Sequence, residues 1–535
     1  MSAAAAGRSR GRLFLLLLVA IAALAAFVRA PGLSRPLWLD EANSVLIAER
    51  GLAGIVDALS RDGNPPLFYF LLRGWTAILG SGEIAVRALP ALFGVALVPL
   101  AWRLARALFP ARPETPALAA ALVALSPLAV YYSQEARMYT LAPLLGGLHL
   151  LFLHAALERG RARDFALASL FLALGLYTHN FFLFVAPAGP ACALLGPGAL
   201  ARRRALAGSI AVAGAAALAY APWVEILLRQ SASGVGAWIE PFWFATPPAA
   251  AIPRSLEVMG PGGAYPEYLL EIGTLSSVVP IEALWLAARI LGAALVALSI
   301  VAGARAALRS EDERPAAARL LVFLFLPLFL PWVASFALKP IYLVGRYEMV
   351  AFMAFAAIAA RGLAALPRRL AIGAGALWLA LNALVLGAYH AHAPLDRERS
   401  LAEWIREVAK PPDVFVFPGY TRTVPEYYLR RWGVDTGRRS FPGAVEEHLG
   451  WFDYDAAASD MGATAEEARD LARSLAPVLA RGGRVFLVTE YAPEPAIAAV
   501  CEALRTALVA ELGTPMGLGE APAGRRAPVE VFRRS

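Results

Sequence analysis

Two adjacent carboxylates, Asp40 and Glu41, follow the first apolar run of the chain by about ten residues. A carboxylate held at a membrane surface can remove the proton from an attacking hydroxyl group of a lipid-borne substrate. The same pair would also suit a solvated turn, or an Asp that caps a helix running from Glu41 to about Arg50. The pair alone does not favour any of these interpretations. The elements around it are needed to distinguish them.

Basic and histidine side chains also occur at the ends of apolar runs. Arginine binds phosphate through paired hydrogen bonds, and fixed cations ease the departure of a phosphate leaving group. Lys339 and Arg346 flank one short loop, where long basic side chains also serve as anchors at the membrane surface. Glu135 and Arg137 are either functional, solvated or paired with other groups. His179 ends an apolar run, where a histidine is more often an interfacial residue than a ligand.

The composition requires a membrane protein. Of the 535 residues 59% are hydrophobic, the mean hydropathy is +0.57, and the net charge is +8. These values exclude an ordinary soluble protein and predict many membrane spans. The sequence has two cysteines, Cys192 and Cys501, and neither CxxC nor HExxH. We therefore expect no disulfide framework and no ready-made zinc site, we leave metal use open, and we expect no nucleic-acid partner.

The first apolar run, 13–28, is preceded by Arg8, Arg10 and Arg12. Arg29 interrupts the small-residue pattern that a signal peptidase needs. We therefore expect an uncleaved first helix whose N-terminus is cytoplasmic.

Arginine-rich loops mark the cytoplasmic ends of the later spans. Applied in order, this rule predicts eleven transmembrane helices, at 13–28, 84–109, 116–132, 138–157, 164–178, a sixth ending before 202, 205–223, 281–304, 317–338, 347–366 and 370–389. Residues 31–83 then form a long outer loop, in which 65–79 is too short to span and is expected to lie in the interface. Residues 225–280, rich in Trp, Phe, Pro and Gly, form a second outer loop that is either interfacial packing or a substrate lid.

The predicted topology collects the unusual polar residues on the outer face. They are Asp40, Glu41, Asn64, Glu135, Arg137, His179, Lys339, Arg346 and Tyr347. A transporter more often places such groups near the middle of the bilayer, on interrupted helices. The pattern favours a surface site that faces a lipid head group.

The composition changes after residue 395. Runs at 414–417, 485–488 and 529–532 are typical of strands, and they alternate with helical stretches. Thr464, with Glu467 three residues later, predicts the start of a helix over 464–476, which Pro477 would end. Residues 396–535 are therefore predicted to form a small extracytoplasmic α/β domain, attached to a membrane domain of residues 1–395.

Four short motifs occur together and in a characteristic order. They are Trp38-Leu-Asp40-Glu41, Asn64-Pro-Pro-Leu67, Arg87-Ala-Leu-Pro90 and Tyr132-Ser-Gln-Glu135-Ala-Arg137-Met-Tyr139, followed later by Arg346-Tyr347. In this combination the chain resembles the bacterial family-39-like glycosyltransferases of the GT-C fold. That group includes protein O-mannosyltransferases and aminoarabinose transferases. The resemblance covers roughly residues 13–390.

The resemblance implies transfer of a sugar from a polyprenyl-phosphate donor, with inversion, at the outer face of a bacterial inner membrane. The acceptor would be a lipid, a glycan or a protein. Asp40 matches the catalytic carboxylate, with Glu41 or Glu135 assisting, and Arg346 matches the residue that meets the donor phosphate.

Lys339 and Arg137 are further candidates for the donor phosphate, and Tyr139, His179 and Tyr347 for other parts of the substrate site. Many relatives carry His or Lys where this chain has Asn64. If that residue contacts phosphate elsewhere, Lys339 or Arg137 would have to supply the missing charge here.

Two other classes of function stay open. A lipid-linked glycan transporter or flippase would need a hydrophilic path through the bilayer and should tolerate Asp40→Asn. An inactive relative that binds through its C-terminal domain is disfavoured by the retained acidic and basic positions.

Overall fold

A computed structural model describes residues 3–195, 199–232, 236–245, 247–261, 282–391, 397–488, 494–517 and 529–534. The chain divides into two compact units. The first contains residues 1–34, 64–229 and 236–393, and the second contains 35–63, 230–235 and 394–535.

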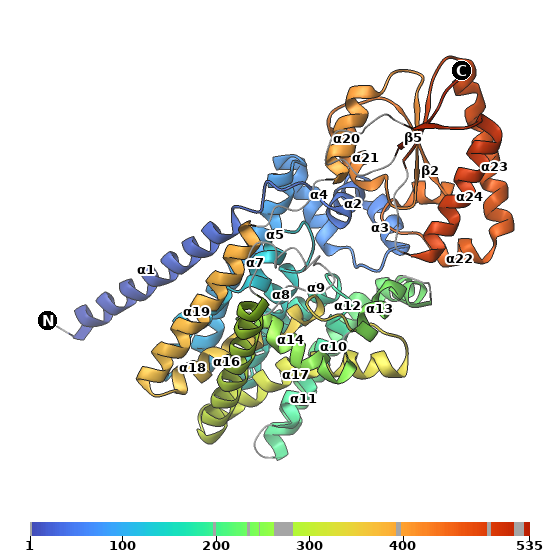
Figure 1. The fold of residues 1–535 in the computed structure, drawn as a ribbon. Helices are drawn as coiled ribbons and strands as arrows, with labels where there is room; N and C mark the ends of the chain where they lie inside the picture. The colour runs from blue at the N-terminus through green and yellow to red at the C-terminus, as the bar shows by residue number, and fades with distance from the viewer. Residues whose placement is uncertain are drawn as a thin grey trace. The chain divides into compact units, whose positions relative to one another are not determined.

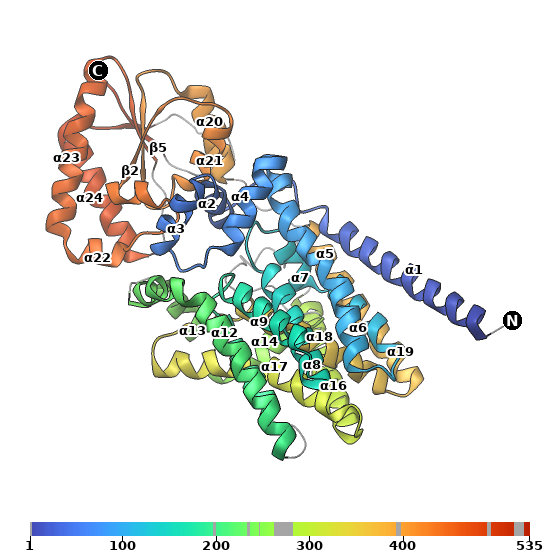
Figure 2. The same cartoon turned by 180° about the vertical axis from the view of Figure 1, so that it is seen from behind.

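The first unit is built from helices (Figure 1). They are α1 Ala3–Arg29, α4 Leu67–Leu79, α5 Glu83–Leu108, α6 Thr115–Ala124, α7 Pro127–Ser133, α8 Leu141–Arg159, α9 Ala162–Leu176, α10 Phe182–Val185, α11 Ala188–Leu194, α12 Ala199–Ala232, α13 Glu240–Ala245, α14 Ala251–Met259, α16 Glu282–Arg309, α17 Arg314–Ala337, α18 Phe352–Ala365 and α19 Arg368–Ala391. Short 3₁₀ turns lie at Ala237–Ile239 (η1), Pro248–Ala250 (η2) and Tyr347–Ala351 (η5). Within the unit α5 packs against α6 and α8, and α16 packs against α18 (Figure 2).

Eight helices of the described residues are long and apolar enough to cross a membrane, or nine if α6 and α7 form one span bent by 53°. The expected count of eleven is higher. Its fifth and sixth spans correspond to α9, of 15 residues, and to the short helices α10 and α11. Hydropathy alone could not show that this apolar stretch is broken into short pieces. The helix expected over 65–79 is present as α4.

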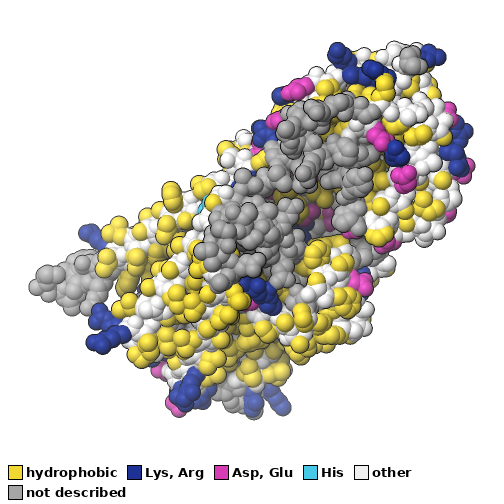
Figure 3. All heavy atoms as spheres, in the orientation of Figure 1, with side chains coloured by type: hydrophobic (Ala, Val, Ile, Leu, Met, Phe, Trp, Pro, Cys, Tyr) yellow, Lys and Arg dark blue, Asp and Glu magenta, His cyan; other side chains and the backbone are white. Residues whose placement is uncertain are grey.

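The surface of the first unit is that of a protein surrounded by lipid. Large apolar side chains such as Leu16, Val301, Phe329 and Ile372 are exposed along its helices. On the face seen in Figure 3, hydrophobic side chains cover most of this unit, and Lys and Arg gather near its lower edge. Because such a surface is costly in water, the chain is a multi-pass membrane protein.

The second unit contains a five-stranded sheet in the order β2-β1-β3-β5-β4. The strands are β1 Val414–Pro418, β2 Gly437–Phe441, β3 Val485–Val488, β4 Met516–Gly517 and β5 Val529–Phe532. β1 pairs in parallel with β2 and β3, and β5 pairs antiparallel with β3 and β4. The three strands predicted from the sequence are confirmed, and the two that were missed, β2 and β4, lie at the edges of the sheet.

The helices of this unit are α2 Leu39–Ala48, α3 Gly51–Ser60, α20 Arg397–Val408, α21 Thr423–Arg431, α22 Tyr454–Ser459, α23 Met461–Ala480 and α24 Pro495–Leu512. A short turn, η6, covers Gly443–Glu447. Leu46 of α2 belongs to the same buried core as Val416 of β1 and Leu504 of α24. The second unit therefore includes residues 35–63, which the sequence assigned to an outer loop of the membrane domain.

The predicted start and end of one helix are wrong. α23 begins at Met461, not Thr464, because the side chain of Asp460 accepts a hydrogen bond from the amide of Ala463 at 3.0 Å and caps it. Pro477 lies inside the helix, which continues to Ala480.

Candidate active site

The turn over residues 134–140 carries three of the predicted site residues between α7 and α8. α7 starts sharply, because Ser126 accepts a hydrogen bond from the amide of Ala129 at 3.3 Å and Pro127 occupies the first helical position. After α7 ends, the amide of Arg137 donates to the carbonyl of Glu135 at 2.7 Å. This tight turn keeps both side chains buried, at 4% and 5% exposure.

Two tyrosines hold the charged side chains of this turn. The hydroxyl of Tyr131 donates to Glu135 Oε1 at 2.6 Å. Arg137 Nη1 donates to the hydroxyl of Tyr69, on α4, at 3.1 Å. Arg137 is therefore positioned by a helix that begins just after the Asn64-Pro65-Pro66 motif.

A second turn, between α17 and η5, presents Arg346. Gly345 adopts a φ of +89°, which side chains other than glycine rarely allow, and so turns the chain just before the arginine. The carbonyl of Gly345 accepts a hydrogen bond from Tyr132, and its amide donates to Glu348 Oε1 at 2.6 Å. The carbonyl and the amide of Gly345 are thus both hydrogen-bonded, which fixes the backbone just before Arg346.

The two turns converge on one aromatic ring. The guanidinium carbon of Arg346 lies 5.1 Å from the ring centre of Tyr139, and that of Arg137 lies 6.0 Å from it. Arg346 also lies 5.4 Å from the ring centre of Trp238, in η1. These distances are typical of cation–π contacts, which hold a guanidinium in place without neutralising its charge.

His179 borders this cluster. Its ring centre lies 5.1 Å from that of Tyr347 and 6.2 Å from that of Tyr139. Burial, and then the charges of Arg346 and Arg137, hold the pKa of His179 far below its usual range. The imidazole is therefore neutral, and because Nδ1 accepts from the amide of Phe181 at 3.1 Å, its proton is on Nε2. It can donate one hydrogen bond without adding a charge.

The structure thus brings Arg137, Tyr139, His179, Arg346 and Tyr347 together in what we call the arginine cluster. Asn64 is half-buried and lies in the same unit, just before α4. Lys339 is exposed and follows the end of α17. The outer loop expected over 225–280 contains the end of α12, η1, α13, η2 and α14, and residues 262–281 lie outside the described residues.

Asp40 and Glu41 belong to the second unit, in the first turn of α2. The helix begins at Leu39, so Asp40 does not cap a helix starting at Glu41. Glu41 is fully buried, and its Oε2 accepts from the amide of Trp38 at 3.4 Å, as the third residue of a capping box does. Asp40 is half-buried, and its carbonyl accepts from Ser44 Oγ at 2.7 Å. Of the two carboxylates, Glu41 is the one engaged in starting the helix.

Several supporting residues were missed from the sequence, among them Tyr69 and Glu348. Tyr69 holds Arg137, and Glu348 holds the turn that carries Arg346. Glu348 had a visible signal, because it is an acidic residue two positions after Arg346 at the start of an apolar run. Tyr69 had none beyond its place in an aromatic helix. Among the described residues no group of three or more His, Cys, Asp or Glu side chains could hold a metal ion.

Residues 63–226 match the family model described as dolichyl-phosphate-mannose-protein mannosyltransferase. No curated protein matches the chain in sequence.

Among solved structures, ArnT from Cupriavidus metallidurans bound to undecaprenyl phosphate is 14% identical, with a TM-score of 0.55 and 97% of each chain covered. The same protein in its apo state is 13% identical, with a TM-score of 0.56 and 98% coverage of each chain. The oligosaccharyltransferase of Archaeoglobus fulgidus, in complex with zinc and sulfate, is 15% identical, with a TM-score of 0.51.

The match to the oligosaccharyltransferase covers 79% of this chain and 62% of that protein, so the chain spans less than two thirds of that relative. At these identities the likeness establishes the fold. The chain has the GT-C fold, with a small α/β domain after its membrane helices.

Proposed function

We propose that this chain is an integral membrane glycosyltransferase that takes its sugar from a polyprenyl phosphate and transfers it to a hydroxyl-bearing lipid, glycan or protein. The arginine cluster carries the proposal. Two buried guanidinium groups, from turns more than 200 residues apart, lie over the ring of Tyr139, next to a histidine that stays neutral. A positive, partly desolvated site of this kind suits a phosphate and its developing negative charge.

The comparisons support the same donor class. The matched family model is named for a polyprenyl-type phosphate donor, and the ArnT structure of the same fold holds undecaprenyl phosphate. In the proposed reaction an acceptor oxygen attacks the anomeric carbon, and the bond from that carbon to the phosphate oxygen breaks. The bonding electrons move to the phosphate, where Arg137 and Arg346 stabilise them, and the configuration inverts.

Asp40 is the proposed base, which takes the proton of the acceptor hydroxyl. It is half-buried in the first turn of α2, whereas Glu41 in the same turn is fully buried. Glu135 already accepts a hydrogen bond from Tyr131 and is proposed to order the turn that carries Arg137. The reaction is placed at the extracytoplasmic face, where the positive-inside rule puts these turns.

The test compares sugar transfer by purified wild type and Asp40→Asn, with a panel of radiolabelled polyprenyl-phosphate sugars and membrane acceptors. We expect transfer by the wild type and a loss of about 100-fold or more in kcat for the variant, the usual effect of removing a general base. Asp57→Asn is the matched control, because Asp57 lies on α3 of the same segment with a 61% exposed side chain. It should retain full turnover.

Equal turnover in Asp40→Asn and wild type would contradict the role of Asp40. Movement of a lipid-linked sugar across vesicles by the wild type, without transfer from any donor of the panel, would contradict the transferase and favour a flippase.

A further inference from the structure

The carboxyl edge of a parallel sheet is where α/β domains usually bind ligands. In the second unit the parallel strands β1 and β2 end at Pro418 and Phe441, so the loops that follow them lie at one edge. These loops are tied together. The amide of Gly419 donates to the carbonyl of Phe441 at 3.3 Å, and Tyr420 donates to the carbonyl of Phe452 at 3.1 Å.

The chain's own residues 35–63, which we call the base segment because they carry Asp40, lie against these loops. Leu46 of α2 is 4% exposed and shares a core with Val445 and Leu449, which follow β2. Asn43, one turn after Asp40, packs so closely on Gly450 that a Cβ added there would lie 2.3 Å from the Asn43 amide carbon. The middle of the base segment is thus fitted to the loop after β2.

The far end of the base segment is held by polar contacts with the same loop. Arg50 donates to the carbonyl of Glu447 at 2.6 Å, and Arg61 pairs with the carboxylate of Glu447. Asp62 Oδ2 lies 3.3 Å from Nε2 of His448, which is 3% exposed. These contacts join residues almost 400 positions apart.

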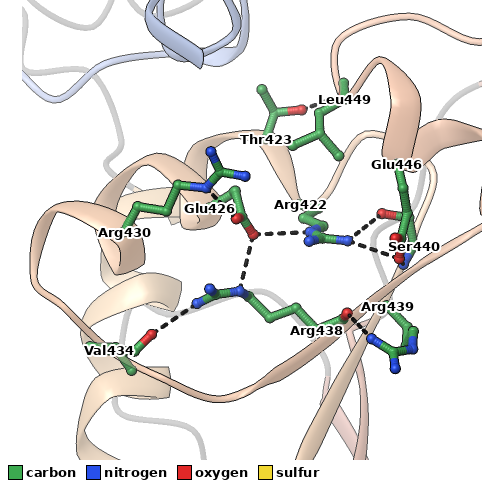
Figure 4. Close-up of polar contacts among 10 residues, drawn as sticks. All are labelled: Arg422, Thr423, Glu426, Arg430, Val434, Arg438, Arg439, Ser440, Glu446 and Leu449. Carbon is green, nitrogen blue, oxygen red and sulfur yellow. Dashed lines mark hydrogen bonds and ion pairs between the residues drawn. The ribbon is translucent and has the colours of Figure 1, made fainter. Parts of the chain in front are cut away.

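The beginning of the base segment is held by α21. The amide of Leu37 donates to the hydroxyl of Tyr428 at 3.1 Å, three residues before Asp40. α21 is itself fastened to the sheet through Glu426, which pairs with Arg422 and Arg430 of its own region and with Arg438 of β2 (Figure 4). The helix that carries Tyr428 is therefore anchored to the sheet by ion pairs of a buried carboxylate.

We infer that the α/β domain binds the base segment and thereby positions the catalytic base. Its carboxyl edge is occupied by the base segment, and Gly450 and Tyr428 are positioning residues that set where Asp40 stands. The inference rests on the proposed function of Asp40. It assigns the domain a task inside this chain.

This inference is tested by enlarging residue 450 and then shortening the side chain that it contacts. Because Asn43 is 5% exposed, its amide has no open space to move into, and Gly450→Ala should push α2 off the loop. Asn43→Ala with Gly450→Ala should restore the fit. Gly462→Ala is the control, since a Cβ there lies 3.4 Å from Asp460 Oδ1, an ordinary contact.

Two quantities are measured on the full-length protein in nanodiscs. Hydrogen exchange of residues 37–48 should accelerate about tenfold or more in Gly450→Ala and return to within about threefold of wild type in the double variant. The kcat of sugar transfer should fall in Gly450→Ala and recover in the double variant. The KM for the donor should stay within about twofold of wild type, because a displaced base slows the chemistry and not donor binding.

The outcomes separate the inference from the proposed function. Unchanged exchange in Gly450→Ala would overturn the docking of α2. Accelerated exchange with unchanged kcat would overturn the positioning role. Absence of transfer by the wild type would instead overturn the proposed function, whatever the exchange shows.

A second pair of variants covers the case in which Gly450→Ala fails to fold. Tyr428→Phe removes only the hydroxyl that accepts from Leu37, whereas Tyr427→Phe removes a hydroxyl that accepts from Arg431 on the same helix at 3.1 Å. The first should lower kcat several-fold and speed exchange at Leu37, and the second should do neither. Equal effects of the two variants would overturn the inference.

Discussion

The guanidinium groups of Arg137 and Arg346 lie where they are largely shielded from water. Aromatic faces attract the guanidinium groups through their quadrupole, and this attraction does not neutralise the positive charge. The neutral state of His179 fits this arrangement, because a third cation beside two others would be unfavourable. At the scale of single residues, the cluster therefore combines two guanidinium groups with a histidine that stays neutral.

Two replacements of Arg346 should distinguish the effect of its positive charge from that of the paired hydrogen bonds of its guanidinium group. We expect Arg346→Ala to lower kcat/KM for the donor about 100- to 1000-fold, as removal of one donor to a developing oxyanion does. Arg346→Lys should recover only part of this loss, since an ammonium group cannot form the paired hydrogen bonds of a guanidinium. The measurement is steady-state transfer at varied donor concentration.

Lys339 provides the comparison for Arg346. Its side chain is exposed, and we interpret it as an anchor at the membrane surface. Lys339→Ala should therefore keep kcat/KM within about threefold of wild type. A loss as large as that of Arg346→Ala would show that Lys339 also contacts the donor phosphate.

At the scale of elements, the attachment of α21 to the sheet depends on one buried carboxylate. Burial alone would raise the pKa of Glu426, but Arg422, Arg430 and Arg438 lower it below the usual range of a glutamate. A lowered folded-state pKa means that the unfolded chain binds a proton first as the pH falls. The contribution to stability is thus complete above about pH 4.3, the value for an unfolded glutamate, and is lost as the pH falls through the folded-state pKa.

Glu426→Gln should destabilise the α/β domain by about 3–5 kcal/mol at pH 7, because three arginines lose their buried partner. The difference from wild type should shrink at pH 4 and below. The measurement is protease resistance of the full-length protein in increasing urea.

Glu403→Gln is the control for this variant. Glu403 pairs with Arg399 at 3.2 Å, and both side chains are about one-third exposed, so the change should cost about 0.5 kcal/mol or less. A pH-independent difference between Glu426→Gln and wild type would contradict the assignment to this carboxylate.

The long apolar helices and the central strands could be read from the sequence, because hydropathy and residue type determine them locally. α5 and α16 lie within a few residues of the predicted spans, and β3 and β5 match their predicted runs. Arg137 and Arg346 could be named as site residues because the predicted topology puts them on the outer face, whereas most arginines fall in cytoplasmic loops, and because both belong to motifs that carry the resemblance.

The sequence could not show which elements pack against one another, because contacts between distant parts of the chain determine this packing. The α2 helix was assigned to the membrane domain, since nothing near Leu46 in the sequence shows that its core neighbours are Val445 and Leu449. The edge strand β2, with sequence Gly-Arg-Arg-Ser-Phe, lacks the apolar pattern of a buried strand. The convergence of Arg137 and Arg346 on Tyr139 likewise depends on turns far apart in the chain.

At the scale of the whole molecule, the positive-inside rule makes a prediction about sidedness. In a background with Cys192 and Cys501 replaced by Ala, a membrane-impermeant thiol reagent should label Lys339→Cys in intact cells. Arg203→Cys, at the start of α12, should be labelled only after the membrane is made permeable. The reverse pattern would place the arginine cluster on the cytoplasmic side and contradict the proposed reaction face.

The hydrogen bond between Leu37 and Tyr428 spans 391 positions, so its two ends are synthesised far apart in time. At 5–20 residues per second the ribosome needs about 20 to 80 seconds to cover that distance. For most of this interval the base segment exists without Tyr428 and without the loops on which it docks. A nascent or truncated copy therefore already has its membrane helices while Asp40 still lacks its support. With Asp40 as the proposed base, sugar transfer therefore requires that synthesis has passed Gly450.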